Sequence, residues 1–407
     1  MAKKTKPQKW RKPRHRLVRN LAWLVLSPYC RVKYGIKTEP YKGQKKGQPY
    51  LILFNHQTAF DQFFVGMAFH GPVYYVASED LFSMGWISKL LRFAVAPIPI
   101  KKQTTDVGAV RTCIRVAKEG GTIALAPEGN RTYSGKTEHI NPAIVGLIRI
   151  LKLPIAFFRI EGGYGVHPRW SDHTRKGKMR AYVARTVEYE TYSKLSDDEL
   201  LTMVKTELYV DEGNAEGVFK HKRLAEGLER AMYYCPKCGI TQYTSKKDVL
   251  TCSSCGLQVR YLPTKELVGV GEPFPYRFTT EWYDAQSAFV HGLDLTPYGD
   301  KPLFTETDVL LSEVVLYAKK KLLSESASIS LFNGRFEIAY GGNAVTLPFE
   351  KISAVTVLGK NKLNLYFDKT VWQFKGGKSM NALKFANLFY HYKNVQAGNP
   401  NEQFLGL

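Results

Sequence analysis

Residues 51–63, LILFNHQTAFDQF, place a histidine and an aspartate directly after an apolar run. A carboxylate that accepts a hydrogen bond from one imidazole nitrogen fixes the tautomer of the ring and leaves the other nitrogen as a base. On one unbroken helix, His56 and Asp61 would point about 140° apart and could not meet. We therefore predict a strand that ends at Asn55, a bend at His56 and a helix from about Ala59, which together fold the carboxylate back onto the ring.

A second polar segment, PEGNR at residues 127–131, follows another apolar run, TIALA. Glycine lets a backbone approach a ligand closely, and the planar fork of Arg131 suits a phosphate group. A histidine followed by an aspartate is weak evidence on its own, because surface turns often contain both residues. Together, a base and a phosphate-binding arginine indicate an enzyme that deprotonates a hydroxyl on a phosphorylated substrate.

These two polar segments need elements that bring them together. From residue 50 to about residue 191, short β-rich runs alternate with helical patterns, which is typical of an α/β domain with a mostly parallel sheet. Ligands of such domains gather at the carboxyl ends of the strands, so both segments are expected at strand exits. Helical patterns at residues 197–209 and 215–233 are expected to close this domain.

Four motifs, in order and spacing, resemble those of the 1-acylglycerol-3-phosphate acyltransferases, within the wider glycerolipid acyltransferases. The family's N-H-x-x-x-x-D motif corresponds here to Asn55, His56 and Asp61. Its E-G-T-R motif corresponds to Glu128, Gly129, Asn130 and Arg131, with Asn130 in the threonine position. The stretch VAPIPIKK resembles the middle motif, with lysines where an arginine is more usual, and LPIAFFRI resembles the fourth. The resemblance covers about residues 15–210.

The resemblance implies transfer of an acyl group from acyl-CoA or acyl-carrier protein to the free hydroxyl of a lysophospholipid. The expected acceptor is 1-acylglycerol-3-phosphate, which would give phosphatidic acid; a different lysolipid acceptor is the alternative. His56 would be the general base and Asp61 its orienting partner, without a metal or a covalent enzyme intermediate in the chemistry. The implied phosphate-binding residues are Glu128, Gly129, Asn130 and Arg131, with Lys101 and Lys102 as weaker additions.

Two cysteine pairs, Cys235-Pro-Lys-Cys238 and Cys252-Ser-Ser-Cys255, are separated by 13 residues. Four thiolates at this spacing predict a tetrahedral structural zinc site, a zinc ribbon. Two disulfides are the alternative, but a reducing cytosol and the lack of a convincing signal peptide oppose them. Four protein ligands leave no open position on the metal, so this zinc is expected to stabilise the fold and not to catalyse.

After the cysteines, residues 276–295 have a helical pattern, and many short strand patterns follow from residue 308, including one at 314–323. These strands and a closing helix resemble a PH-like or GRAM-like barrel capped by a C-terminal helix. The expected organisation is a basic amphipathic membrane-associating segment at 1–46, an acyltransferase domain at 47–230, a zinc ribbon at 231–262, a linker with a helix at 263–305, and the PH-like β domain at 306–396.

The net charge of +22 and the pI near 9.6 predict a phosphate-bearing partner. Residues 1–46 hold 15 Lys and Arg against one acid, and they enclose the apolar stretch LVRNLAWLVLSPY. Its uninterrupted apolar part is about ten residues, whereas a bilayer span needs about 20. We expect an interfacial helix on an anionic membrane surface, peripheral or monotopic on the cytoplasmic face. An ordinary amphipathic helix that lies on the domain is the alternative.

The basic ribbon also allows a different function class, a nucleic-acid-binding protein. The largest basic run adjoins an apolar interfacial stretch, however, and no aromatic-basic RNA motif is evident. Nucleic acid is therefore not an expected partner, whereas a membrane surface, a lysophospholipid and an acyl-carrier protein are.

Overall fold

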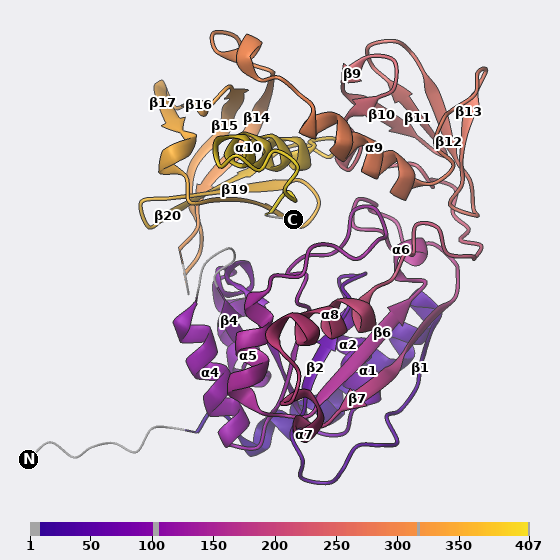
Figure 1. Cartoon of the computed structure of the whole chain (residues 1–407), viewed down its shortest axis with the longest axis vertical. Coiled ribbons are helices and arrows are strands. Elements are labelled where there is room, and N and C mark those ends of the chain that lie inside the picture. Colours follow the sequence, from indigo (N-terminus) through magenta and orange to yellow (C-terminus); the bar gives the residue numbers. More distant parts are fainter. Residues whose placement is uncertain (1–8, 101–105, 316–317, 406–407) are drawn as a thin grey trace, which may run out of the picture.

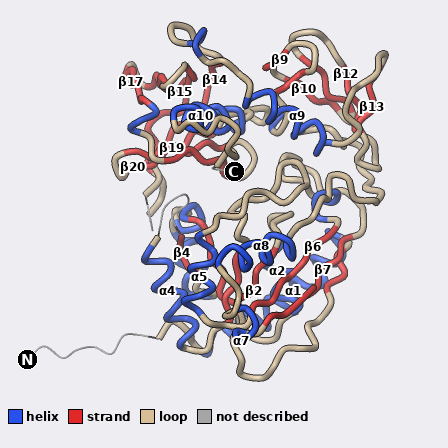
Figure 2. The backbone as a smooth tube through the Cα atoms, in the orientation of Figure 1, coloured by secondary structure: helices blue, strands red, loops and turns tan. Residues whose placement is uncertain are grey.

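The computed structural model describes residues 9–100, 106–315 and 318–405. An α/β domain built from the first half of the chain lies below two β-rich regions built from the second half (Figure 1). Figure 2 shows the strands of the α/β domain side by side in one sheet, with helices in front of it and behind it.

The sheet of the α/β domain has seven strands in the order β1-β7-β6-β2-β5-β3-β4. All neighbouring strands pair in parallel except β6 and β7, so the predicted mostly parallel sheet is confirmed. Strand β2 lies between β5 and β6, and all three end at the same edge. The strands are β1 Ile36–Thr38, β2 Leu51–Phe54, β3 Val73–Ser78, β4 Ile98–Ile100, β5 Thr122–Leu125, β6 Ile155–Glu161 and β7 Met179–Val187.

Alternate residues of the central strand face opposite sides of the sheet, as the pleat requires. Leu51 and Leu53 pack under α4, α5 and α8, whereas Ile52 and Phe54 pack against α1 and α2. Both faces of the sheet are therefore covered, which suits a parallel sheet. The helices of this domain are α1 Pro13–Tyr34, α2 Asp61–Ala68, α3 Trp86–Ala94, α4 Val107–Lys118, α5 Ala143–Leu151, α6 Gly163–Val166, α7 Tyr189–Tyr192 and α8 Asp197–Leu208. In the described part of the chain, no helix is both long enough and apolar enough to cross a bilayer.

Small antiparallel sheets and the turns that follow their strands contain the four cysteines: Cys235 ends β8 and Cys252 ends β11, whereas Cys238 and Cys255 lie in turns. A two-stranded sheet and a four-stranded sheet in the order β10-β11-β12-β13 lie next to α9. The elements are β8 Tyr234–Cys235, β9 Gly239–Ile240, β10 Tyr243–Lys246, β11 Val249–Cys252, β12 Gln258–Tyr261, β13 Leu267–Val270 and α9 Thr279–His291. The helix expected within residues 276–295 is thus present.

The C-terminal region is a seven-stranded antiparallel sheet in the order β17-β16-β15-β14-β20-β19-β18. Helix α10, Ala382–Gln396, packs against β18 and β19. The predicted β-rich region is confirmed, and the structure shows that its strands pair antiparallel; its likeness to a PH-like barrel stays a prediction. The strands are β14 Phe304–Glu313, β15 Lys321–Phe332, β16 Arg335–Tyr340, β17 Asn343–Pro348, β18 Ala354–Leu358, β19 Lys362–Phe367 and β20 Thr370–Lys375.

Two predicted elements are wrong. The helix expected at residues 215–233 is a loop with one 3₁₀ turn, Leu228–Arg230. Gly217 and Gly227 in this loop have φ of 152° and 97°, which an α-helix does not allow. The apolar side chains of the loop pack into the core one by one and do not form a helical stripe. The strand expected at 314–323 is wrong in its first part: residues 314–315 and 318–320 belong to the connection between β14 and β15, residues 316–317 lie outside the described ranges, and residues 321–323 form the start of β15.

Candidate active site

The end of strand β2 is fixed to strand β6 by a buried asparagine. Asn55 donates from Nδ2 to the carbonyl of Ile160 and accepts from the N–H of Ile160 at its Oδ1, both at 2.8 Å. The side chain thereby replaces the next pair of ladder hydrogen bonds at the point where the chain turns away. Asn55 thus determines where the following histidine leaves the sheet.

The predicted bend brings the histidine and the aspartate together. The Nδ1 atom of His56 lies 2.8 Å from Oδ2 of Asp61, whose carboxylate is fully buried. The same carboxylate accepts the N–H groups of Gln57 and Thr58 and the hydroxyl of Thr58. Helix α2 begins at Asp61, two residues later than predicted, because this carboxylate holds a turn first. With Nδ1 bonded to the carboxylate, Nε2 is the ring atom that can take up a proton.

A second carboxylate holds the histidine through its backbone. Glu128 follows strand β5, the neighbour of β2, and its two oxygens accept the N–H of His56 at 2.8 Å and that of Glu138 at 2.9 Å. Burial raises the pKa of Glu128 to about 8, although both N–H donors act in the opposite direction. Glu128 therefore binds backbone N–H groups, and it joins the turn that contains His56 to the loop that contains Glu138.

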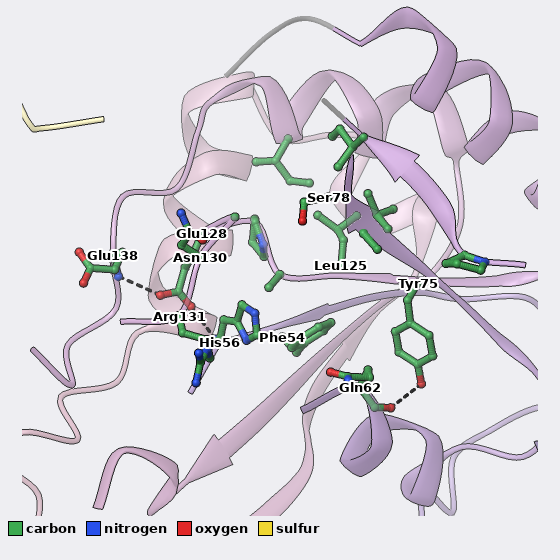
Figure 3. Close-up of a pocket in the computed structure, with 18 of the residues that line it drawn as sticks. Phe54, His56, Gln62, Tyr75, Ser78, Leu125, Glu128, Asn130, Arg131 and Glu138 are labelled. Atoms are coloured by element: carbon green, nitrogen blue, oxygen red, sulfur yellow. Dashed lines mark hydrogen bonds between the residues drawn. The ribbon is translucent and has the colours of Figure 1, made fainter. Parts of the chain in front are cut away.

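Arg131 lies beside the histidine, as Figure 3 shows. Its Nη1 atom is buried and has no hydrogen-bond partner among the described residues. Burial and the neighbouring Arg169 lower the pKa of Arg131 to about 10, so the guanidinium remains charged at neutral pH. A cation with a buried, unbonded donor atom suits an anionic ligand, because buried donors are rarely left without an acceptor.

The remaining predicted phosphate-binding residues lie as follows. Gly129 has φ of 71°, a conformation that favours glycine, and it lines the same cavity as Asn130. Lys101 and Lys102 lie outside the described residues. Ile100, the last residue of β4, lines the cavity. The role of the two lysines stays a prediction.

A cavity of about 1560 Å³ contains the histidine. Glu138 and Tyr75 lie on opposite sides of His56 (Figure 3). The apolar lining of the cavity includes Phe54, Phe63, Val76, Leu91, Val110 and Leu125. Of these, Phe54 and Leu125 lie on the side of Tyr75 (Figure 3). The side of Glu138 carries polar side chains, some of which come from α9 and from the chain after α10.

Sequence reasoning missed the residues that join this site to the rest of the chain. Arg169, only 1% exposed, donates to the carbonyl of Arg131 at 2.8 Å and to two carbonyls of the C-terminal region. Residues of α9 also line the cavity. No local pattern in the sequence marks either feature, because both depend on contacts between distant segments.

The four cysteines form a cluster away from this cavity. Their sulfur atoms all lie within 4.8 Å of one another, and the Sγ atoms of Cys235 and Cys255 are 3.8 Å apart. A disulfide would need about 2.05 Å. Tetrahedral Zn–S bonds of about 2.3 Å place two sulfurs about 3.8 Å apart. The donor set and spacing therefore fit one zinc ion held by Cys235, Cys238, Cys252 and Cys255.

Comparisons with known proteins agree with the motifs. The family model described as Acyltransferase matches residues 35–160. A 1-acyl-sn-glycerol-3-phosphate acyltransferase of Bacillus subtilis (strain 168) is 22% identical over 129 residues, which are 32% of this chain and 61% of the relative. The chain thus spans about three fifths of that relative's length.

A solved structure is also similar over part of the chain. It is the 1-acyl-sn-glycerophosphate (LPA) acyltransferase PlsC from Thermotoga maritima, with 20% identity and a TM-score of 0.39. The similarity covers 46% of this chain and 77% of that structure. From the family match, the chain carries a domain similar to the acyltransferases, and that domain contains both His56 and Glu128–Arg131.

Proposed function

We propose that the protein moves an acyl group from acyl-CoA or acyl-carrier protein to the free hydroxyl of a lysophospholipid. The expected acceptor is 1-acylglycerol-3-phosphate, and the product is phosphatidic acid. The observation that carries this proposal is the 2.8 Å contact of His56 Nδ1 with Asp61, beside the unbonded Nη1 of Arg131. The match of residues 35–160 to the acyltransferases supports it.

In this reaction His56 acts as a general base. Its Nε2 takes the proton of the acceptor hydroxyl while the hydroxyl oxygen forms a bond to the thioester carbonyl carbon. The buried carboxylate of Asp61 stabilises the resulting imidazolium. The tetrahedral intermediate then breaks its C–S bond, and the leaving thiolate takes the proton back from Nε2. Arg131 holds the phosphate of the acceptor so that its hydroxyl lies near the base.

The protein reaches its lipid substrate through two helices on one surface. Helices α1 and α3 contain no acidic residue, and the guanidinium of Arg14 in α1 lies 4.0 Å from the centre of the Phe93 ring in α3. Both helices expose large apolar side chains and also supply residues that line the cavity. An anionic membrane on the cytoplasmic face would accept these apolar groups and the basic ones around them. The exposed apolar residues are Leu17, Leu21, Trp23, Leu24, Val25, Val32, Trp86, Leu90 and Phe93.

The cysteine cluster holds a structural zinc ion in this proposal. Four thiolates complete the coordination, so the zinc would fix the ribbon and leave no position for a substrate. The ribbon shares one apolar core with the loop that contains Trp170, and this loop also carries Arg169. The metal would therefore support the site at a distance, through packing.

The decisive experiment measures acyl transfer by the purified protein from acyl-CoA and from acyl-carrier protein to a panel of lysolipids. The wild type should acylate a phosphate-bearing lysolipid. His56→Ala should reduce the rate by about 10²–10⁴-fold, the usual contribution of a positioned base. Asp61→Asn should also reduce it, because the amide cannot stabilise an imidazolium. Unchanged activity in both variants, or no transfer by the wild type to any lysolipid, would refute the proposal.

A further inference from the structure

One wall of the cavity comes from the second half of the chain. Tyr283, Ser287 and His291 are spaced four residues apart on α9, so they lie on one face of that helix, and all three line the cavity. We call these three residues the α9 wall. Figure 1 places α9 and the C-terminal end of the chain above the α/β domain.

Contacts between distant segments hold the α9 wall in place. Lys136 Nζ lies 3.3 Å from Asp284 Oδ2, and His139 Nδ1 lies 2.5 Å from Gln403 Oε1. The ring centre of His291 lies 4.4 Å from that of Phe404. The loop after the PEGNR motif, helix α9 and the chain after α10 therefore meet at this side of the cavity.

The α9 wall contains polar groups that the chain itself does not satisfy. Tyr283 is 7% exposed, and its hydroxyl has no hydrogen-bond partner within the described ranges; the same holds for Nε2 of His291. Buried polar groups in proteins are almost always hydrogen-bonded, so these atoms indicate a ligand. The charges near this wall are already compensated: Lys136 pairs with Asp284, and the carboxylate of Glu138 accepts the N–H of Tyr133 and lies near the charge of Arg169. A neutral group that can both donate and accept hydrogen bonds, such as a hydroxyl, suits this wall best.

The α9 wall is continuous with the phosphate end of the site. Glu138 donates its N–H to Glu128, and its carboxylate is close enough to Tyr283 to help raise the pKa of that phenol, after burial. Tyr283 therefore stays protonated and can donate. Arg131, Glu138 and Tyr283 line the same cavity, so a substituent on a phosphate that Arg131 binds can extend within that cavity to the α9 wall.

We propose that the acceptor carries a hydroxyl-bearing headgroup on its phosphate, a glycerol or another polyol, and that Tyr283 and Ser287 bind this headgroup. This inference rests on the proposed function, in which Arg131 holds the phosphate. It replaces 1-acylglycerol-3-phosphate as the preferred acceptor with a lysophospholipid whose headgroup is larger than the phosphate alone, while the acyl transfer itself stays as proposed.

The test compares acceptors that differ only in the headgroup. With full-length protein and acyl-CoA, kcat/KM is measured for lysophosphatidic acid, lysophosphatidylglycerol and lysophosphatidylcholine. The wild type should prefer lysophosphatidylglycerol to both others. Tyr283→Phe should lower kcat/KM for lysophosphatidylglycerol by about three- to tenfold, the effect of one lost hydrogen bond, and leave lysophosphatidic acid within about twofold. Tyr133→Phe is the control. The hydroxyl of Tyr133 is also buried and has no hydrogen-bond partner among the described residues, but Tyr133 does not line the cavity.

Several results would overturn the inference. Preference for lysophosphatidic acid or lysophosphatidylcholine would do so, and so would an equal effect of Tyr283→Phe on all acceptors. A change confined to the KM for acyl-CoA would assign the α9 wall to the pantetheine arm of the donor.

Calorimetric titration of His56→Ala with soluble short-chain lysophosphatidic acid and lysophosphatidylglycerol separates this inference from the reaction. Selective binding of the glycerol headgroup by this variant, together with no acyl transfer by the wild type, would contradict the proposed function alone, whereas equal binding of the two lysolipids would contradict the role of the α9 wall.

Discussion

Two carboxylates hold His56 in different ways. Asp61 binds the ring and the backbone of the next two residues, so it sets the tautomer and the turn together. Glu128 does not bind the ring; it binds the backbone N–H of His56 and that of Glu138. The position of the base therefore depends on a residue of the neighbouring strand exit. A change at Glu128 is expected to act through geometry, whereas a change at Asp61 acts on both geometry and charge.

Arg131 should determine the affinity for phosphate. Arg131→Ala removes a partly buried guanidinium whose Nη1 has no acceptor in the described chain. The KM for lysophosphatidic acid should rise by about 10- to 100-fold, because a charged hydrogen bond contributes about 1.5–3 kcal/mol. A phosphate-free acceptor, monoacylglycerol, should be affected little. Arg111→Ala, on the exposed side of α4, controls for net charge. An equal loss for both acceptors would make the role of Arg131 structural.

The buried carboxylate of Glu128 should make stability depend on pH. Its pKa is raised from 4.5 to about 8, so the native state binds this proton more tightly than the unfolded chain does. The stabilisation is complete below 4.5 and is lost as the pH rises towards about 8. As the pH rises across this window, the melting temperature of the wild type should therefore fall by more than that of Glu128→Gln, whose side chain cannot ionise. Differential scanning calorimetry at several pH values measures both curves. Parallel curves would mean that the two N–H donors keep Glu128 ionised.

At the scale of elements, local patterns could be predicted and long-range contacts could not. The apolar run and the five-residue spacing determine β2, its bend and α2, because Asp61 bonds to residues three to five positions earlier. The ion pair of Lys136 with Asp284 joins residues 148 apart, and the bond of Arg169 to Val357 joins residues 188 apart. Such contacts leave no periodic signal in the sequence. The histidine that acts as the base can therefore be predicted from the sequence, together with its aspartate, whereas the α9 wall cannot.

Helix α3 should contribute to membrane binding together with α1. Trp86 is 72% exposed and Leu90, one turn later, is 53% exposed. Replacing both by serine should weaken binding to anionic liposomes by at least about tenfold, because a buried apolar side chain contributes about 1.5–3 kcal/mol. Co-sedimentation with liposomes of phosphatidylglycerol or phosphatidylcholine measures the change. Val395→Ser on α10 is the control, since this exposed valine lies in the C-terminal region. Unchanged binding would exclude α3, and a preference for DNA over liposomes would favour the nucleic-acid alternative.

The ribbon should depend on one zinc ion. Metal analysis of the purified chain should give about one zinc per protein, and Cys252→Ser should reduce this content. A chelator should lower the melting temperature of the wild type, because structural zinc contributes directly to folding. Ser253→Ala, at an exposed position next to Cys252, should leave zinc content and melting temperature unchanged. A structural metal site would be contradicted if the wild-type protein contained no zinc, or if a chelator changed neither its zinc content nor its melting temperature.

For the molecule as a whole, a buried arginine joins the phosphate-binding motif to the C-terminal region. The guanidinium of Arg169 donates to the carbonyls of Arg131, Val357 and Gly359 at 2.8–2.9 Å. The largest apolar core likewise contains residues of the α/β domain, the ribbon and the C-terminal sheet. The C-terminal region is therefore packed as part of the site's support, and damage to this contact should affect substrate binding.

Arg169→Lys tests this connection, because an ammonium group keeps the charge but cannot reach three carbonyls in the same plane. Each carbonyl left unpaired costs about 1–3 kcal/mol, so the free energy of unfolding in a denaturant titration should fall. Arg230→Lys is the matched control: Arg230 is also buried and binds the carbonyls of Trp170 and Lys378, but not that of Arg131. Both variants should lose stability, whereas only Arg169→Lys should raise the KM for the phosphate-bearing acceptor, by about three- to tenfold, with kcat little changed. An equal rise of KM in both variants would mean that general loosening of the interface, and not the bond to Arg131, affects the site.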